Sequence, residues 1–232
     1  MMLQTPGRIY LADQHGTHCT PHSSRCSVFS FGAYQDAQRP ALGRLLAFNQ
    51  ETLGGGQQLT LDAPQDVGCL VLPLTGAIQC AVSAEPVQVE VEQVWVSRLS
   101  AQQSVTLHNP FPEDAVQFLH IWLEPNQTAA TQLAPVLAYT FEELEQGLAR
   151  VMDFSDDWPF ALLLGRFQGR QETAHPVQQP GNLIFAYALA GAFEIEGRLL
   201  HPNDGLALWP TQAAEIEALS NNALLLLLEV KG

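Results

Sequence analysis

Apolar and polar residues alternate one by one in short stretches of this chain. The clearest stretch runs from residue 87 to residue 92, where Val87, Val89 and Val91 are interleaved with Gln and Glu. Successive side chains of a β-strand point to opposite faces, so the alternation predicts a strand with one wet face. Other short apolar runs are separated by Gly, Pro and Asn, a pattern typical of an all-β protein.

Two longer apolar runs have a glycine near their middle. Residues 70–78 contain the pair Thr75-Gly76, and residues 183–195 contain Gly191. Glycine supplies the positive φ that tight turns between strands require. Each run therefore predicts a hairpin of two strands, and the two halves of the chain look alike.

The region between the halves has a different composition. Residues 126–147 are richer in Thr, Ala, Gln and Glu, and residues 140–143 have the Thr-x-x-Glu spacing of a helix capping box. This pattern predicts a linker with one short helix. Near the C-terminus, residues 223–230 contain five consecutive leucines, and eight residues suit a buried strand that closes a second barrel.

Composition and charge narrow the function classes. The chain has 232 residues and is 47% hydrophobic, enough for a large buried core, and its net charge is −14. Nucleic acids and anionic membranes are polyanions, so this charge disfavours direct contact with either. Without a signal sequence or a spanning segment, we expect a cytoplasmic protein that is a monomer or a weak homodimer.

Several spaced motifs resemble those of the pirin-related bicupins, a family of the cupin superfamily. In the first half they are Phe29-Ser30-Phe31-Gly32-Ala33-Tyr34, then Gly43-Arg44-Leu45 with Asn49, and Ile121-Trp122-Leu123-Glu124-Pro125. A weaker likeness in the second half rests on Asn203-Asp204-Gly205 and the strands that end in the leucine-rich run.

The resemblance implies an all-β bicupin with two jelly-roll barrels in one chain. We expect a pirin-like cupin barrel at residues 1–130, a linker at 131–147 and a second cupin barrel at 148–232. In many relatives the first barrel holds iron or another divalent metal through three His and one Glu, and some relatives use it to oxidise flavonols such as quercetin. Imidazoles and a carboxylate can leave metal positions open for substrate or oxygen.

The sequence departs from that ligand pattern. Between Gly56 and Gly76, residues 62–64 read Asp-Ala-Pro where the family has His-x-His, and Gly68 or, by a looser count, Asp66 stands where the Glu belongs. The family's later His-Ser-Glu maps onto residues 105–107 or, with a shifted gap, 107–109, which include His108. We therefore expect no cofactor, with a divalent transition metal at Asp62 and His108 as the alternative. The corresponding positions of the second barrel, Val177, Gln179 and Leu183, carry no such ligands.

The four cysteines fall into two groups, one near the N-terminus and one further along the chain. His15, His18, Cys19, His22 and Cys26 crowd into twelve residues, which suits a polar loop, a zinc site or redox-active thiols at Cys19 and Cys26. Cys69 and Cys80 are expected as buried small hydrophobic residues. Cys69 joins Asp62 and His108 as a candidate pocket residue.

Three functions remain open at this point. The first is a bicupin without a functional metal that binds a small molecule or a protein partner, so that no catalytic residue is expected. The second is a metal-dependent dioxygenase of the quercetinase type with altered ligands, which rests on analogy with the family. The third is a thiol-based sensor of oxidative stress that uses Cys19 or Cys26.

Overall fold

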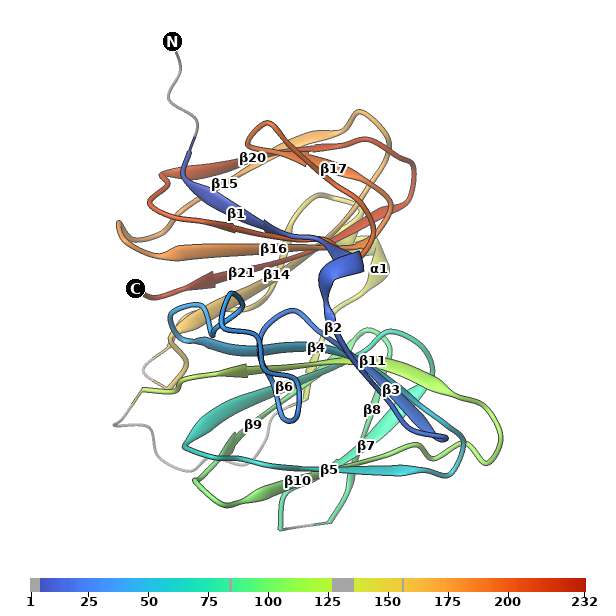
Figure 1. The fold of residues 1–232 in the computed structure, drawn as a ribbon. Coiled ribbons are helices and arrows are strands. Elements are labelled where there is room, and N and C mark those ends of the chain that lie inside the picture. The colour runs from blue at the N-terminus through green and yellow to red at the C-terminus, as the bar shows by residue number, and fades with distance from the viewer. Residues whose placement is uncertain (1–4, 84, 127–135, 156) are drawn as a thin grey trace. The chain divides into compact units, whose positions relative to one another are not determined.

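The computed structural model describes residues 5–83, 85–126, 136–155 and 157–232. They form two compact units, one of residues 15–138 and one of residues 139–232 with the segment before residue 15. Each unit is a sandwich of two antiparallel sheets (Figure 1). The all-β, two-barrel jelly-roll architecture expected from the sequence is thus confirmed. No helix within the described ranges is long and apolar enough to cross a membrane.

The first unit, here called the N-terminal barrel, packs a larger sheet against a smaller one. Within the described residues the larger sheet has the order β12 (Val136–Ala138), β9 (Gln93–Leu99), β6 (Val67–Pro73), β11 (Val116–Leu123), β4 (Leu45–Leu53), β3 (Ser23–Ser27) and β2 (Gly16–Cys19). The smaller sheet has the order β5 (Gln58–Asp62), β10 (Ser104–His108), β7 (Ala77–Ala81) and β8 (Val87–Glu90). Apolar side chains from both sheets fill the space between them, among them Trp95, Leu107 and Phe118.

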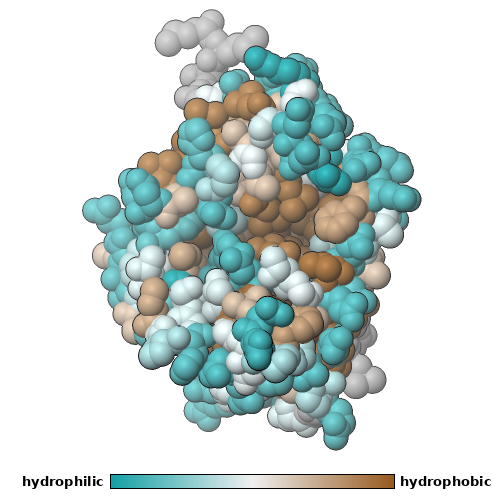
Figure 2. Space-filling view, turned by 90° about the vertical axis from the view of Figure 1, so that its right-hand side faces the viewer, coloured by the Kyte–Doolittle hydropathy of each residue, from teal (hydrophilic) through white to brown (hydrophobic). Residues whose placement is uncertain are grey.

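The second unit, here called the C-terminal barrel, is built in the same way. Its larger sheet has the order β1 (Gly7–Tyr10), β19 (Gly205–Leu208), β16 (Leu183–Ala190), β21 (Ala223–Val230), β14 (Phe160–Phe167) and β13 (Ala149–Met152). Its smaller sheet has the order β15 (Glu172–Pro176), β20 (Ala213–Ala218), β17 (Phe193–Ile195) and β18 (Arg198–Leu200). A 3₁₀ turn spans Ala12–Gln14, and α1 spans Phe141–Leu144. In Figure 2, hydrophilic side chains cover much of the face in view, with smaller hydrophobic patches between them.

Several local predictions are confirmed. The alternating stretch forms β8, in which Val89 is fully buried as predicted, whereas Val87 and Val91 of the same apolar set are 37% exposed. The leucine-rich run forms β21, which is central in its sheet between β16 and β14. Thr140 caps α1 as a capping box with Glu143. This capped helix lies in the expected linker, and residues 131–135 of that linker lie outside the described residues.

The two expected hairpins are wrong in their pairing. β6 pairs with β9 and β11, whereas β7 pairs with β8 and β10, so the turn at Gly76 carries the chain from one sheet to the other. Gly191 does the same between β16 and β17 of the C-terminal barrel. Both glycines have positive φ, 65° and 73°. The sequence signals the turn correctly, but it carries no information about the strand that each arm will pair with.

The first strand, β1, lies outside the barrel that was expected to contain residues 1–130. β1 pairs with β19 from Gly7 opposite Leu208 to Tyr10 opposite Gly205, so it belongs to the C-terminal barrel. Asp204 strengthens this attachment by accepting a hydrogen bond of 2.7 Å from the backbone of Ala12. A four-residue strand at the edge of a sheet has no sequence feature that identifies its distant partner.

Candidate functional site

The N-terminal barrel contains a pocket of about 560 Å³, a size typical of small-molecule sites. Its buried floor is formed by Ala47 of β4, Val67 of β6 and Trp122 of β11. Arg25 and the ring of Phe31 form a partly buried wall, and exposed residues that include Thr60, Asp62 and Gln65 surround the opening. Apolar side chains fill the space between the two sheets, and this pocket lies beside them, with Ala47, Val67 and Trp122 of that core in its lining.

A connected group of polar side chains lies in the barrel beside this floor. His120 and Glu51 are buried, and Nε2 of His120 lies 2.8 Å from Oε1 of Glu51. The guanidinium of Arg25 forms an ion pair with the same carboxylate. Burial lowers the pKa of His120 below its usual value, and its hydrogen bond to Glu51 opposes that shift. The imidazole is therefore neutral at pH 7.

Strand register explains why these residues meet. Arg25 of β3 is opposite Glu51 of β4, and Glu51 is opposite Phe118 of β11, two residues before His120. Alternate residues of β4 and β11, such as Ala47 and Trp122, face the apolar interior, so Glu51 and His120 share that face. The motifs in the sequence did not single out Arg25, Glu51 or His120. The Gln-Glu-Thr stretch inside an otherwise apolar β4 was the available signal.

Aromatic rings enclose the polar group. Phe31 contacts His120 edge to face with the ring centroids 5.2 Å apart, and it contacts Trp122 in the same way at 5.0 Å. The guanidinium carbon of Arg25 lies 4.8 Å from the centroid of Phe31, within the range of a cation–π contact. The ring of Phe31 thus packs against Arg25 and His120 of the polar group as well as against Trp122.

The structure does not bring the three candidate pocket residues together. Asp62 is at the opening, where it accepts a hydrogen bond of 2.6 Å from Ser104, while Cys69 is fully buried in β6. His108 lies opposite Gln58, four positions along β10 from the Ser104–Asp62 pair, and contacts Gln79. Four strand residues span about 13 Å, too far for one metal ion to bind both Asp62 and His108.

The donor set therefore does not fit the metal that the cupin fold implies. Asp66, the other carboxylate considered, accepts hydrogen bonds from the backbone of Ala101 and from Arg98. Across the described residues, no group of three or more His, Cys, Asp or Glu side chains could hold a metal ion. That statement includes the cluster of His and Cys at residues 15–26.

The two candidate redox thiols are both exposed, Cys19 on β2 and Cys26 on β3. In the register of these strands Cys26 lies opposite Thr17, and His18 lies opposite Arg25. Burial, together with Cys19 and Glu51, raises the pKa of Cys26. Burial raises the pKa of Cys69 to about 12 and that of Cys80 well above its usual value.

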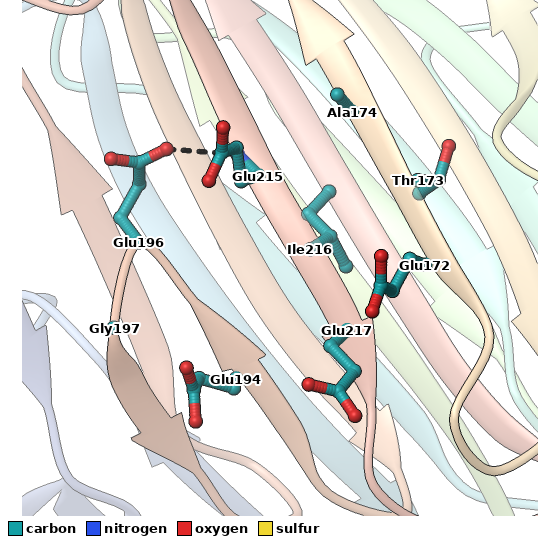
Figure 3. A pocket seen from close by; sticks show the side chains of 9 residues that line it. All are labelled: Glu172, Thr173, Ala174, Glu194, Glu196, Gly197, Glu215, Ile216 and Glu217. Atoms are coloured by element: carbon teal, nitrogen blue, oxygen red, sulfur yellow. Dashed lines mark hydrogen bonds between the residues drawn. The ribbon is translucent and has the colours of Figure 1, made fainter.

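A second pocket, of about 450 Å³, lies on the smaller sheet of the C-terminal barrel (Figure 3). Its walls carry five glutamates, Glu172, Glu194, Glu196, Glu215 and Glu217. Glu217 lies directly opposite both Glu172 and Glu194 in the strand register. Glu196 accepts a hydrogen bond of 2.9 Å from the backbone of Glu215, and Arg170 forms an ion pair with Glu217.

The interior of the C-terminal barrel holds a buried carboxylate of its own. Glu229 accepts hydrogen bonds from Asn182 at 2.6 Å and from the backbone of Gln178 at 2.8 Å, and it contacts His175 at 2.8 Å. Its hydrogen-bonding capacity is used within the barrel. This cluster ties β15 and the segment that follows it to β21.

Comparison with known proteins places this geometry among the cupins. Residues 160–230 match the quercetinase C-terminal cupin domain. The crystal structure of YhhW from Escherichia coli superimposes with a TM-score of 0.85 at 18% identity, covering 97% of both chains. A second structure from that organism, titled bacterial pirin YhhW in complex with nickel(II), gives 0.84 at 18% identity over 97% of this chain and 99% of that one.

A more distant structural relative is quercetin 2,3-dioxygenase from Acinetobacter baumannii. Its TM-score is 0.71 at 14% identity, over 97% of this chain and 79% of that one. No curated protein matches the sequence at a significant level. At these identities the structural comparisons establish the fold and leave the chemistry to the residues present.

Proposed function

We propose that this chain, a pirin-related bicupin, binds a small uncharged molecule in the pocket of its N-terminal barrel and needs no metal to do so. The observation that carries the proposal is the 560 Å³ pocket with its apolar floor and aromatic wall. Arg25, the cation of the wall, is already paired with Glu51, and Asp62 at the opening is acidic. The pocket therefore has no excess positive charge that would favour an anionic ligand.

Shape and chemistry favour a planar ligand. The rings of Phe31 and Trp122 stand nearly perpendicular to each other, at 85°, and both line the pocket. A flat molecule can stack on one ring while its edge contacts the other. Ala47 on the floor leaves room that a larger side chain would fill, so this position controls access to the deepest part of the pocket.

The test is a fragment screen against the wild type and a pocket-filling variant. Uncharged aromatic fragments are screened by saturation-transfer NMR and by the shift in thermal midpoint. Ala47→Leu should abolish binding, whereas Ala101→Leu, the same change on an exposed turn, should leave it unchanged. If no fragment binds, or if Ala47→Leu binds fragments as the wild type does, the proposal fails. Circular dichroism confirms that both variants are folded.

A competing function is a metal-dependent dioxygenase of the quercetinase type. It is favoured by the match of residues 160–230 to the quercetinase C-terminal cupin domain. Elemental analysis of untagged protein, repeated for Asp62→Ala and His108→Ala, separates the two functions. We expect no stoichiometric transition metal and no oxygen consumption with flavonols when iron, copper, manganese or cobalt is added. One metal per chain that is lost in both variants, together with oxygen consumption on flavonols, would instead establish the oxygenase.

A further inference from the structure

Two buried polar side chains beside the pocket floor have atoms without a hydrogen-bond partner. They are Asn49, through both Nδ2 and Oδ1, and His120, through Nδ1. Both side chains are fully buried. Native proteins rarely leave such groups unpaired, because a buried donor or acceptor without a partner loses its hydrogen bonds to water with no compensation. Three such atoms on neighbouring residues call for a polar partner from outside the chain, either water or a ligand.

The strand register places these atoms together and next to the pocket. Asn49 of β4 and His120 of β11 are direct cross-strand partners, and the next inward pair along the same strands is Ala47 with Trp122. Ala47 and Trp122 both line the pocket. Phe31, which also lines the pocket, covers His120 edge to face. A ligand on the floor reaches Asn49 and His120 once the ring of Phe31 turns aside.

The hydrogen-bond roles of the two residues follow from their neighbours. Glu51 accepts from Nε2 of His120, because a carboxylate has no proton to donate, and Arg25 holds that carboxylate in place. The proton of the neutral imidazole is therefore on Nε2, and Nδ1 presents a lone pair. The amide of Asn49 adds N–H donors and one carbonyl acceptor. Together the two residues offer the N–H donors of Asn49 Nδ2 and two acceptors, Oδ1 of Asn49 and Nδ1 of His120.

We propose that Asn49 and His120 form a subsite for the primary carboxamide of an uncharged planar ligand. The ligand carbonyl accepts from Nδ2 of Asn49, its N–H on the carbonyl side donates to Oδ1 of Asn49, and its second N–H donates to Nδ1 of His120. A carboxylate is a poor fit because it has no proton to donate and would bring a second negative charge close to Glu51. The inference rests on the proposed function, since it specifies the ligand of the same pocket.

Three probes of nearly equal shape test the subsite. Benzamide has the carbonyl and both N–H groups, acetophenone has the carbonyl alone, and benzoate is charged. Isothermal titration of wild-type protein should give benzamide a Kd about tenfold lower than acetophenone, as expected for added hydrogen bonds to buried partners. Benzoate should bind more weakly than either. In parallel, benzamide but not acetophenone should shift the ¹⁵N resonance of His120 Nδ1.

Two variants separate the subsite from the rest of the pocket. Asn49→Leu removes the amide at similar volume and should bring benzamide to the affinity of acetophenone. Ala101→Leu, on an exposed turn outside the pocket lining, should preserve the tenfold difference. If Asn49→Leu does not fold, the wild-type comparison and the Nδ1 resonance decide the question.

The outcomes distinguish this inference from the proposed function. Equal affinities for benzamide and acetophenone with an unchanged Nδ1 resonance would mean that the subsite holds only ordered water, and the carboxamide inference would be wrong. If both probes then still lose binding in Ala47→Leu, the pocket stands as a small-molecule site. If neither probe nor any other fragment binds, both proposals fail.

Discussion

Oε1 of Glu51 lies 2.8 Å from Nε2 of His120 inside the N-terminal barrel, and Arg25 pairs with the same carboxylate. The relationship fixes the orientation of the imidazole in the way that a carboxylate orients histidine in many functional sites. It also fixes the wall of the pocket, because Arg25 and His120 both contact the ring of Phe31. The wall of the pocket and the stability of the barrel therefore depend on one buried carboxylate.

Removing that charge should destabilise the protein strongly. Glu51→Gln leaves the guanidinium of Arg25, whose side chain is only 12% exposed, without its partner. Loss of one member of a buried pair typically costs about 3 kcal/mol. Urea unfolding at pH 7 measures the change, and the barrel should retain little of its fragment binding because Phe31 loses its support.

The matched control is a surface pair. Arg166 and Glu145 lie 3.0 Å apart with exposed fractions of 34% and 54%, so Glu145→Gln should cost less than about 0.5 kcal/mol. If the two variants have similar free energies of unfolding, the buried Arg25–Glu51–His120 group contributes no more than a surface contact.

The fold was largely predictable, and particular strands show why. The alternating residues predicted the strand β8, and the leucine run predicted the strand β21. Both could be predicted because the burial of one or both faces of a strand determines where its apolar residues lie in the sequence. The sequence of a strand does not show which other strand it pairs with. The pairing of β6 with β9 and β11, and of β1 with β19, depends on packing between distant segments, so the sequence suggested hairpins and a boundary that the structure replaces.

The site was less predictable for the same reason. Asp62 and His108 were chosen by their positions in a motif, but the register of β5 and β10 keeps them apart. Asn49, Glu51 and His120 come from strands that are distant in sequence, and the sequence does not show that β4 and β11 are neighbours. Motif positions identify residues that relatives use, whereas a new arrangement of residues becomes visible only once the strands are paired.

The buried carboxylate of the C-terminal barrel should make stability depend on pH. Burial alone would raise the pKa of Glu229, but the hydrogen bonds from His175, Asn182 and the backbone of Gln178 outweigh it and lower the pKa below its usual value of 4.5. In the unfolded chain this carboxyl takes up its proton first as the pH falls. The ionised Glu229 therefore contributes its full stabilisation to the folded protein above pH 4.5. That stabilisation is lost as the pH falls through the lower pKa that Glu229 has in the folded protein.

Glu229→Gln tests this dependence directly. The variant should be less stable than the wild type by about 2 kcal/mol at pH 7, and the gap should narrow steadily below pH 4.5 in urea unfolding. Leu227→Ala, an apolar truncation in the same strand, should cost about 3 kcal/mol with a gap that does not change with pH. A constant gap for Glu229→Gln would contradict the lowered pKa.

The glutamates of the second pocket should destabilise their sheet. Glu217 lies opposite both Glu172 and Glu194, and like charges on paired strands repel. Glu194→Gln should therefore raise the free energy of unfolding by about 0.5 kcal/mol at low salt. The gain should fall as salt is added, because exposed charges are screened. Glu142→Gln, on the exposed helix α1, is the control, and an equal gain there would point to the net charge of −14 instead.

Alkylation kinetics test whether the exposed thiols can act as a sensor. Folded protein treated with iodoacetamide at pH 7.5 should be modified at Cys19 and Cys26, whereas the buried Cys69 and Cys80 should react only after denaturation. Cys26 should react more slowly than an unstructured cysteine peptide, because the thiolate is the nucleophile and burial together with Cys19 and Glu51 raises the pKa of this thiol. Mass spectrometry of timed samples gives the rate at each site, and Cys19→Ser should speed the reaction of Cys26 by removing one of the groups that raise its pKa. A rate at Cys26 above that of the peptide would contradict the raised pKa and return the thiol-sensor hypothesis to consideration.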